Sequence, residues 1–410
     1  MKPLLSLLIA CLVLPLAGLA AEAPQSNQVD QAAVVEGNNA FAVALYGQLR
    51  SQDGNLFFSP ESISTALAMT YAGARGDTAA EMAKTLHFTL PPERLHPAMG
   101  ALLSNLNASH NGYQLRVADA LWAQRDYVFL DDFLKLNKSD YGAGFNQVDF
   151  KGATEAARLT INQWIEQKTE NKIKDLLQPG VLDSLTKMVL TNAIYFKGDW
   201  LTPFVKAWTE DDDFHLSPTK NVKAPLMHLT GGFDYFDGGT FQALEIPYES
   251  GDLSMIVFLP KDLGGLPALE ESLTASNMKL WLDRLQPVPE VILTLPKFQM
   301  TRQFGLEGTL GAMGMPSAFD AAAADFSGMT GKRELFISAV IHKAYINVDE
   351  KGTEAAAATA VVMEKAMAMP PRFKQPPPPV FRADHPFVFL IRDNRSGSML
   401  FMGRVNDPTK

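Results

Sequence analysis

Apolar runs of strand length are spread along the whole chain. Residues Val340 to Val348 alternate in polarity, with the even-numbered positions, His342 among them, on the apolar face. This alternation predicts a strand that turns one face to the core. The runs Lys187–Lys197, Leu253–Leu259 and Val388–Ile391 are almost wholly apolar, which predicts strands buried on both faces.

Helical patterns lie between these runs. The short apolar run Leu56–Phe58 leads into Ser59-Pro60, a cap and first-turn pair that predicts the start of a helix. Further helices are predicted at Val34–Leu49, from a cap at Thr78 to Leu86, and at Thr154–Lys168. Because helices and strands are intermixed without regular βαβ units, the predicted fold class is α+β.

The first twenty residues have the pattern of a secretory signal peptide. Lys2 precedes an apolar stretch that ends in small residues at Ala20 and Ala21. Cys11, the only cysteine, lies inside this stretch; a lipoprotein processing box there is disfavoured because the apolar run continues beyond it. We expect cleavage near Ala20, secretion, no membrane attachment, no disulfides, and a loose segment at residues 21–36.

Composition and motifs exclude several functions. The formal net charge of −9 argues against a nucleic-acid binder, which would carry a basic patch. The chain has no G-x-S-x-G elbow, no H-E-x-x-H and no P-loop, and its seven histidines lack metal-ligand spacing. We therefore predict no metal, no cofactor and no conventional enzyme active site.

The segment after the alternating strand, from Asp349 to Met363, carries the functional prediction. Gly352 gives backbone freedom, and a run of small side chains follows. At period two, the odd-numbered residues from Thr353 to Met363 are uncharged, whereas Glu354 and Glu364 fall on the other face. Alanine content alone favours a helix. The residues on either side of the segment, however, indicate an extended conformation.

Those residues resemble the serpins, a family of serine protease inhibitors. Glu350–Thr359 is similar to the hinge of an inhibitory reactive loop. Four further segments resemble serpin motifs in the same order along the chain: Asn55–Ile63, Thr191–Trp200, Phe381–Phe389 and Ser398–Val405. The resemblance runs from about Gly37 to Pro408, and the signal peptide and cysteine-free body favour a secreted bacterial member.

The resemblance implies one domain over residues 37–410, with three β-sheets, eight or nine helices and a reactive loop at about 350–380. A serine protease would attack the loop, and the cut loop would enter the main sheet and trap the acyl-enzyme. The implied reactive bond joins Ala366 and Met367, which favours an elastase-like or subtilisin-like target. Lys365 is the alternative reactive residue, for a trypsin-like target, and Met367 is a third option, for a chymotrypsin-like one. The implied hinge residues are Glu350, Gly352, Thr353, Glu354, Ala355, Ala356, Ala357 and Ala358.

The resemblance also implies residues that control the opening of the main sheet. A polar cluster beneath the sheet would contain Ser59, Ser62, Asn192 and His342. Trp200 and Lys297 would lie where insertion begins, with Lys297 paired to Glu350.

Other functional classes remain open at this point. A non-inhibitory serpin, such as a carrier, chaperone or storage protein, is the first alternative, although the small hinge residues argue against it. A hydrolase that uses Ser59 and His342 is the second. We expect a monomer without heparin activation, because the segment Glu93–His110 holds Arg94 but no lysine.

Overall fold

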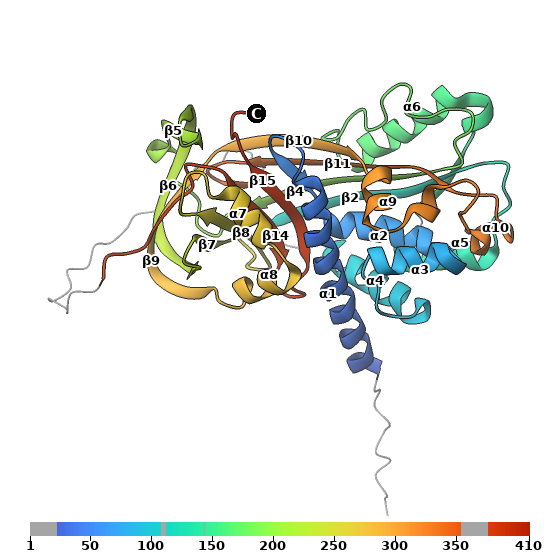
Figure 1. Ribbon diagram of the computed structural model, residues 1–410, viewed down its shortest axis with the longest axis horizontal. Coiled ribbons are helices and arrows are strands. Elements are labelled where there is room, and N and C mark those ends of the chain that lie inside the picture. Colours follow the sequence, from blue (N-terminus) through green and yellow to red (C-terminus); the bar gives the residue numbers. More distant parts are fainter. Residues whose placement is uncertain (1–22, 108–111, 143, 354–375) are drawn as a thin grey trace, which may run out of the picture.

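The computed structural model describes residues 23–107, 112–142, 144–353 and 376–410 (Figure 1). Its strands form two hydrogen-bonded networks. The first, here called the main sheet, has the strand order β10-β11-β12-β4-β2-β3. Its strands are β2 (Tyr113–Gln124), β3 (Phe145–Val148), β4 (Met188–Asp199), β10 (Phe298–Gly305), β11 (Ile337–Val348) and β12 (Gly352–Thr353).

The main sheet matches the hydrophobic pattern of its strands. β4 is buried over nearly its whole length, as its apolar run predicted. In β11, the even-numbered residues from Val340 to Val348 are all buried, whereas Lys343, Tyr345 and Asn347 are only partly so. The alternation of Val340–Val348 therefore placed His342 correctly on the core side of the sheet.

The second network connects nine strands through the long strand β6 (Lys220–Asp237). The first half of β6 pairs with β5 (Glu210–Ser217), and the rest pairs with β9 (Gln286–Pro296) and β7 (Phe241–Pro247). Three β-sheets were expected. The main sheet is one of them, and β6 belongs to both of the other two, which therefore form a single network. The other strands are β1 (Leu56–Phe58), β8 (Leu253–Pro260), β13 (Val380–Arg382), β14 (Phe387–Asp393) and β15 (Met399–Val405).

Helices cover both faces of the main sheet (Figure 1). One face packs on α6 in a core of its own, and the other packs on α2 in the large common core. The described residues contain ten α-helices, and the last of them is a single short turn. They are α1 (Ala23–Leu49), α2 (Pro60–Tyr71), α3 (Gly76–Thr85), α4 (Pro92–Asn107), α5 (Asp131–Tyr141), α6 (Phe150–Lys168), α7 (Leu266–Ser272), α8 (Ala275–Leu282), α9 (Glu307–Met313) and α10 (Ser327–Thr330); two 3-10 turns lie at Lys206–Trp208 and Pro316–Phe319.

The N-terminal region corrects one prediction. The segment 21–36 was expected to be loose, yet α1 begins at Ala23. Tertiary contacts stabilise this part of the helix: Val34 and Val35 are buried, and the carboxylate of Asp30 accepts a bond of 3.1 Å from Nε of Arg94. The polar sequence of this segment does not predict a helix by itself, because the residues that stabilise the helix, such as Arg94, lie far away along the chain.

Helix starts agree with the sequence in one case and differ in two. Ser59 caps α2, and its Oγ accepts from the amide of Ser62 at 3.2 Å. Thr78 does not cap α3: it is buried inside the helix, and its hydroxyl accepts from the amide of Asp325 at 2.9 Å. α6 begins four residues earlier than Thr154, because Asp149 caps it through the amide of Gly152.

Candidate functional site

The candidate site is the seam between β4 and β11 at the centre of the main sheet. The two strands pair in parallel from Met188 beside Ile337 to Tyr195 beside Tyr345. Beyond this point they part, and β12 lies between their ends. Thr353 pairs with Gly198 of β4 and with Val348 of β11, antiparallel to both. The first two residues of a new central strand are therefore already in place.

Gly352 is required at the entrance to the seam. A Cβ atom there would lie 2.0 Å from the carbonyl oxygen of Gly198, so no other residue fits this close approach. The next residue, Thr353, is fully buried, and its hydroxyl lies 2.8 Å from the hydroxyl of Tyr248. The two residues that begin the alanine-rich segment thus sit inside the sheet.

Trp200 holds the turn that leads into β12. Its amide donates to the carbonyl of Lys351 at 2.7 Å, and its indole Nε1 donates to the carbonyl of Asp349 at 3.0 Å. Its ring stacks on Tyr248, with centroids 4.6 Å apart. Trp200 therefore fixes both the backbone and the side-chain pocket at the start of the seam.

Glu350 anchors the same turn on its other side. Its carboxylate accepts from Nζ of Lys297 at 2.7 Å and from the hydroxyl of Thr209 at 3.0 Å. Burial acts to raise the pKa of Glu350, but these bonds outweigh it and the pKa is lowered. The structure thus brings Lys297 and Glu350 together, and it adds Thr209, which the sequence did not indicate.

A polar cluster crosses the seam below β12. Asp119, Asn192 and His342 occupy one row in register across β2, β4 and β11. The side-chain amide of Asn192 donates to the carboxyl of Asp119 and to the hydroxyl of Ser62, and its oxygen bonds Nδ1 of His342. Ser62 donates to Asp119 at 2.9 Å. The cluster therefore links β2, β4, β11 and α2.

The ring of His342 has one tautomer that satisfies this network. Its Nε2 accepts from the backbone amide of Ser59 at 3.2 Å, so Nδ1 carries the proton and donates to Asn192. Burial lowers the pKa of His342 to about 3, which keeps the ring neutral. Because Nε2 faces the amide of Ser59 while Ser59 Oγ accepts from Ser62, the geometry does not form the nucleophile–base pair of a hydrolase.

Comparison with known proteins identifies the family of this chain. The family model described as serpin, serine protease inhibitor, matches residues 36–408. The chain is a serpin. Leukocyte elastase inhibitor A of Rattus norvegicus is 42% identical over 381 residues, covering 90% of this chain and 98% of the relative. The leukocyte elastase inhibitor of Homo sapiens is 40% identical with the same coverage, and an uncharacterised serpin-like protein of Thermococcus kodakarensis is 41% identical over 92% of this chain and 86% of its own.

Solved structures place the fold in the same family. Uncleaved ovalbumin superimposes with a TM-score of 0.82 at 28% identity, over 92% of this chain and 100% of the other. Maspin gives 0.84 at 27% identity, with coverage of 93% and 100%. Serpin48 of Tenebrio molitor gives 0.80 at 31% identity, with coverage of 94% and 99%. The fold predicted from the serpin resemblance is confirmed.

The expected reactive bond of this serpin lies outside the described residues. So do Glu354, Ala355, Ala356, Ala357, Ala358, Lys365, Ala366 and Met367. The described residues continue from 376 into β13, which pairs in parallel with β9. Arg382 at the end of β13 donates to Asp384 and to Asp212, both at 2.6 Å. The segment after the loop is thus tied to two neighbouring strands.

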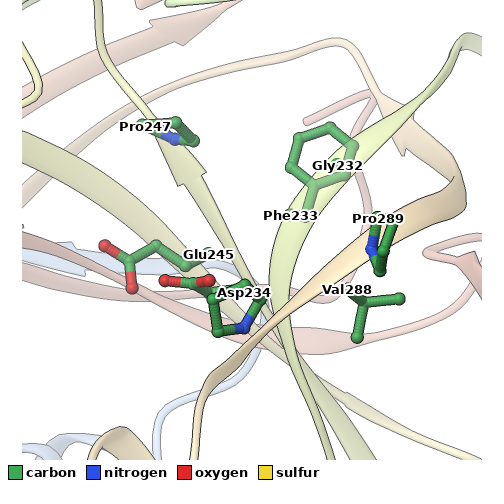
Figure 2. A pocket seen from close by; sticks show the side chains of 8 residues that line it. Gly232, Phe233, Asp234, Glu245, Pro247, Val288 and Pro289 are labelled. Atoms are coloured by element: carbon green, nitrogen blue, oxygen red, sulfur yellow. The ribbon is translucent and has the colours of Figure 1, made fainter.

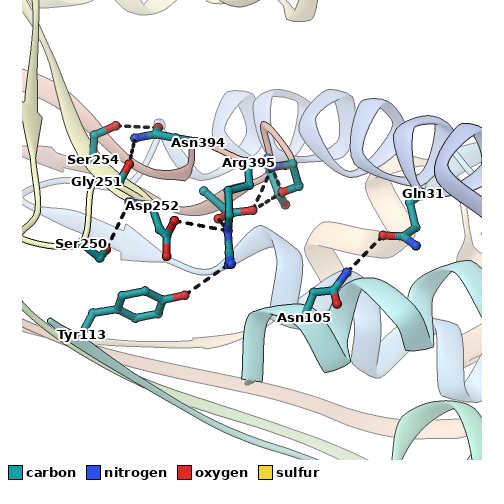
Figure 3. A network of polar contacts seen from close by, with 12 residues as sticks. Gln31, Asn105, Tyr113, Ser250, Gly251, Asp252, Ser254, Asn394 and Arg395 are labelled. Atoms are coloured by element: carbon teal, nitrogen blue, oxygen red, sulfur yellow. Dashed lines mark hydrogen bonds and ion pairs between the residues drawn. The ribbon is translucent and has the colours of Figure 1, made fainter. Parts of the chain in front are cut away.

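Other polar sites of the serpin lie away from the seam. Figure 2 shows the side chains that line a cavity, which offer two carboxylates but no nucleophile or histidine: Gly232, Phe233, Asp234, Glu245, Pro247, Pro287, Val288 and Pro289. The cavity has a volume of about 360 Å³. In Figure 3, Arg395 contacts Asp252, and it donates to the hydroxyl of Tyr113 at 3.5 Å, which links the two strand networks. Burial raises the pKa of Tyr113 to about 12. These contacts of Arg395 therefore hold the loop after β14 against β2.

The described residues offer neither a metal-binding cluster nor a helix that could span a membrane. Within residues 23–107, 112–142, 144–353 and 376–410, no group of three or more His, Cys, Asp or Glu is placed to hold a metal ion. None of the helices described is both long enough and apolar enough to cross a membrane.

The sequence analysis did not single out four residues of the site: Glu61, Asp119, Thr209 and Tyr248. Each contacts or neighbours a predicted residue, and only Glu61 lies within one of the serpin-like segments, Asn55–Ile63. The signal for Asp119 was present: it is an acid within the otherwise apolar run Ala118–Ala123. An acid inside a predicted strand indicates either an exposed face or a buried polar partner, and here the partner is Asn192.

Proposed function

We propose that this serpin inhibits serine proteases as a suicide substrate, by inserting its cleaved loop between β4 and β11. The observation that carries the proposal is the position of β12. Its two residues lie between the two strands that would have to part, and they run antiparallel to both. Continued insertion needs only the separation of the parallel β4–β11 pair.

The register of β12 predicts where each loop residue would arrive. Thr353 lies beside Gly198 of β4 and Val348 of β11. Because the pairing is antiparallel, each later loop residue would pair with the residue one number lower in β4 and in β11. Thr359 would then reach the level of Asn192 and His342, where its hydroxyl could replace the bond that they lose. Met363 would reach Met188, the first residue of β4. The segment Thr353–Met363 therefore has the length of the seam.

The side chains of this segment fit the two faces of the sheet. Thr353 points toward Tyr248 in the common core, so the odd-numbered residues, which are uncharged, would follow it there. Glu354 would lie on the opposite face at the level of Lys197, which can pair with it. About a dozen new ladder bonds at about 1 kcal/mol each give a driving force on the order of 10 kcal/mol, to which apolar burial adds.

The chemical step uses the protease's own machinery. Its serine would attack the carbonyl carbon of Ala366, an ester would form with Ala366, and the amine of Met367 would take up a proton and leave. Insertion would then carry the ester away before water hydrolyses it. Ala366 suits a small pocket such as that of elastase, and the names of the relatives, leukocyte elastase inhibitors, support this target class. A subtilisin-like protease is the other proposed target, and Lys365 is the alternative reactive residue, for a trypsin-like one.

We expect a secreted monomer that needs no cofactor and no heparin. The pattern of residues 1–20 supports export, and N-terminal sequencing of the mature protein tests it. Within α4, Arg94 is engaged by Asp30, which supports the absence of a basic heparin surface.

The decisive experiment mixes the purified protein with elastase, subtilisin, trypsin and chymotrypsin. An SDS-stable complex of inhibitor and protease is expected with elastase or subtilisin. The control is the same protease blocked at its serine with phenylmethylsulfonyl fluoride, which must give no complex. Clean cleavage without complex for every protease would contradict the proposal and favour a carrier, chaperone or storage serpin. Hydrolysis of peptide substrates by the protein itself would favour an enzyme.

A further inference from the structure

Two carboxyl groups, on α2 and on β2, have no cationic partner among the residues that the structure describes. Glu61 of α2 is 2% exposed, and its Oε1 accepts from the hydroxyl of Thr65 at 3.1 Å. Part of the Asp119 residue remains accessible, but its Oδ2 is buried and has no hydrogen-bond partner. Its Oδ1 accepts from both Ser62 and Asn192. The second oxygen of Asp119 therefore has the surroundings of a neutral, protonated acid.

Burial favours the neutral forms of the two acids, and it outweighs the hydrogen bonds from Thr65 to Glu61 and from Ser62 and Asn192 to Asp119. Burial is the main cause that raises the pKa of Glu61 to about 7, and burial together with Glu61 raises that of Asp119 well above its usual range. Their hydrogen-bond partners are Ser62 and Thr65 from α2 and Asn192 from β4, and Asn192 in turn bonds the neutral ring of His342 from β11. Among the residues that the structure describes, no charged side chain of the other elements packed on α2 and β2, namely α1, α3, α4, α6, β3 and β15, acts on either carboxyl.

The position of Asp119 couples it to the opening of the sheet, and Glu61 of the packed helix α2 acts on Asp119 through its charge. Asp119 bonds Asn192, and Asn192 bonds His342 across the strands that would separate. When β4 and β11 part, the Asn192–His342 bond breaks and the row of Asp119, Asn192 and His342 is no longer covered by the closed sheet. Water then reaches carboxyl groups that the closed sheet keeps dry.

We propose that Glu61 and Asp119 make the opening of the main sheet depend on pH, holding the seam closed while they are protonated and easing it once they ionise. The proposal rests on the proposed function, since it regulates the same insertion of the loop between β4 and β11.

The sign follows from proton linkage. In the opened, hydrated state each acid ionises with a pKa of about 4, whereas the closed state keeps its proton to a higher pH. The closed state is therefore favoured most below the pKa of the hydrated acid. It loses this advantage as the pH rises toward about 7, where Glu61 ionises in the closed sheet. For one acid that becomes fully hydrated, opening increases by up to about tenfold for each pH unit in this window.

A peptide that copies the loop measures the opening directly. The probe is a fluorescein-labelled peptide with the sequence of residues 353–364, TEAAAATAVVME, and the readout is its rate of uptake by the intact protein between pH 5 and pH 8. We expect uptake to be faster at pH 8 than at pH 5 by up to about a hundredfold, that is, up to about tenfold for each of the two pH units between pH 5 and about pH 7. The double variant Glu61→Gln/Asp119→Asn, which keeps both shapes and removes both titrations, should vary less than about twofold. Asp53→Asn, at an exposed acid, is the matched control and should keep the full slope.

Several results would overturn the inference. These are an unchanged slope in the double variant, a wild-type uptake rate that does not vary with pH, and absence of uptake at every pH. If the double variant does not fold, infrared titration of wild-type protein decides instead: it must show a protonated carboxyl that persists above pH 5 and disappears on peptide uptake. The proposed function fails separately. Protein that takes up peptide with the expected slope but forms no covalent complex refutes inhibition and leaves this inference standing.

Discussion

Replacement of Thr353 by arginine tests the insertion mechanism at its first step. Thr353 is fully buried between Gly198 and Val348, and its hydroxyl meets that of Tyr248. Arginine in this place has no carboxylate partner among the contacts that Thr353 makes. The hinge must then leave the sheet, or a charge must stay buried.

Both outcomes raise the free energy of the inserted state. An unpaired buried charge costs several kcal/mol even after relaxation, and a Tyr248 hydroxyl without its partner costs about 1–3 kcal/mol. Set against a driving force on the order of 10 kcal/mol, the complete insertion remains favourable. Its first step, however, slows: a barrier raised by about 3 kcal/mol lowers the rate by roughly a hundredfold. Hydrolysis of the acyl-enzyme then outruns trapping, and the inhibitor becomes a substrate.

The assay is the stoichiometry of inhibition, measured by titrating a fixed amount of protease and separating complex from cleaved protein on SDS gels. We expect Thr353→Arg to yield cleaved protein with little complex. Thr353→Val keeps the shape without a charge and should retain most of the complex, and Thr202→Arg, at an exposed position, should behave like the wild type. If Thr353→Arg traps protease as efficiently as the wild type, the loop does not insert along β12 and the mechanism is wrong.

Three further predictions follow from the same structure. Cleavage within residues 354–375 should raise the thermal unfolding temperature, because the freed segment adds a strand to the main sheet; equal melting curves for intact and cleaved protein would argue for a non-inhibitory serpin. The C-terminal fragment released on complex formation should begin at Met367 by mass spectrometry, whereas a fragment that begins at Ala366 would point to Lys365 and a trypsin-like target. Glu270→Ala should lower the free energy of unfolding in urea by about 3–5 kcal/mol, since it leaves the buried Arg404 without its carboxylate at 2.9 Å; the exposed pair of Asp283 with Lys279 is the control, and Asp283→Ala should cost under about 1 kcal/mol.

Local patterns in the sequence predicted the buried face of β11 and the start of α2. Alternation over Val340–Val348 placed His342 on the core face, because side chains of a strand change face at every residue. Ser59-Pro60 located the start of α2, since capping and proline geometry depend on neighbouring residues alone. The serpin resemblance then supplied Asn192, Trp200 and Lys297, which no local pattern marks as functional.

The tertiary structure decided everything that depends on distant partners. The polar segment before Val34 is helical because Arg94 and the core contact it. Asp119 belongs to the site because β2 places it beside Asn192, and Glu61 because α2 places it near enough to act on Asp119. The burial of Glu61 and of Asp119 Oδ2 raises their pKa values, which is why the opening of the sheet can depend on their protonation. The register of β12 was also invisible in the sequence: Gly352 was predicted for its backbone freedom, but it is required because the carbonyl of Gly198 leaves no room for a Cβ atom. Periodicity and capping act over a few residues, whereas burial, register and proton affinity are set by which strands the fold places side by side.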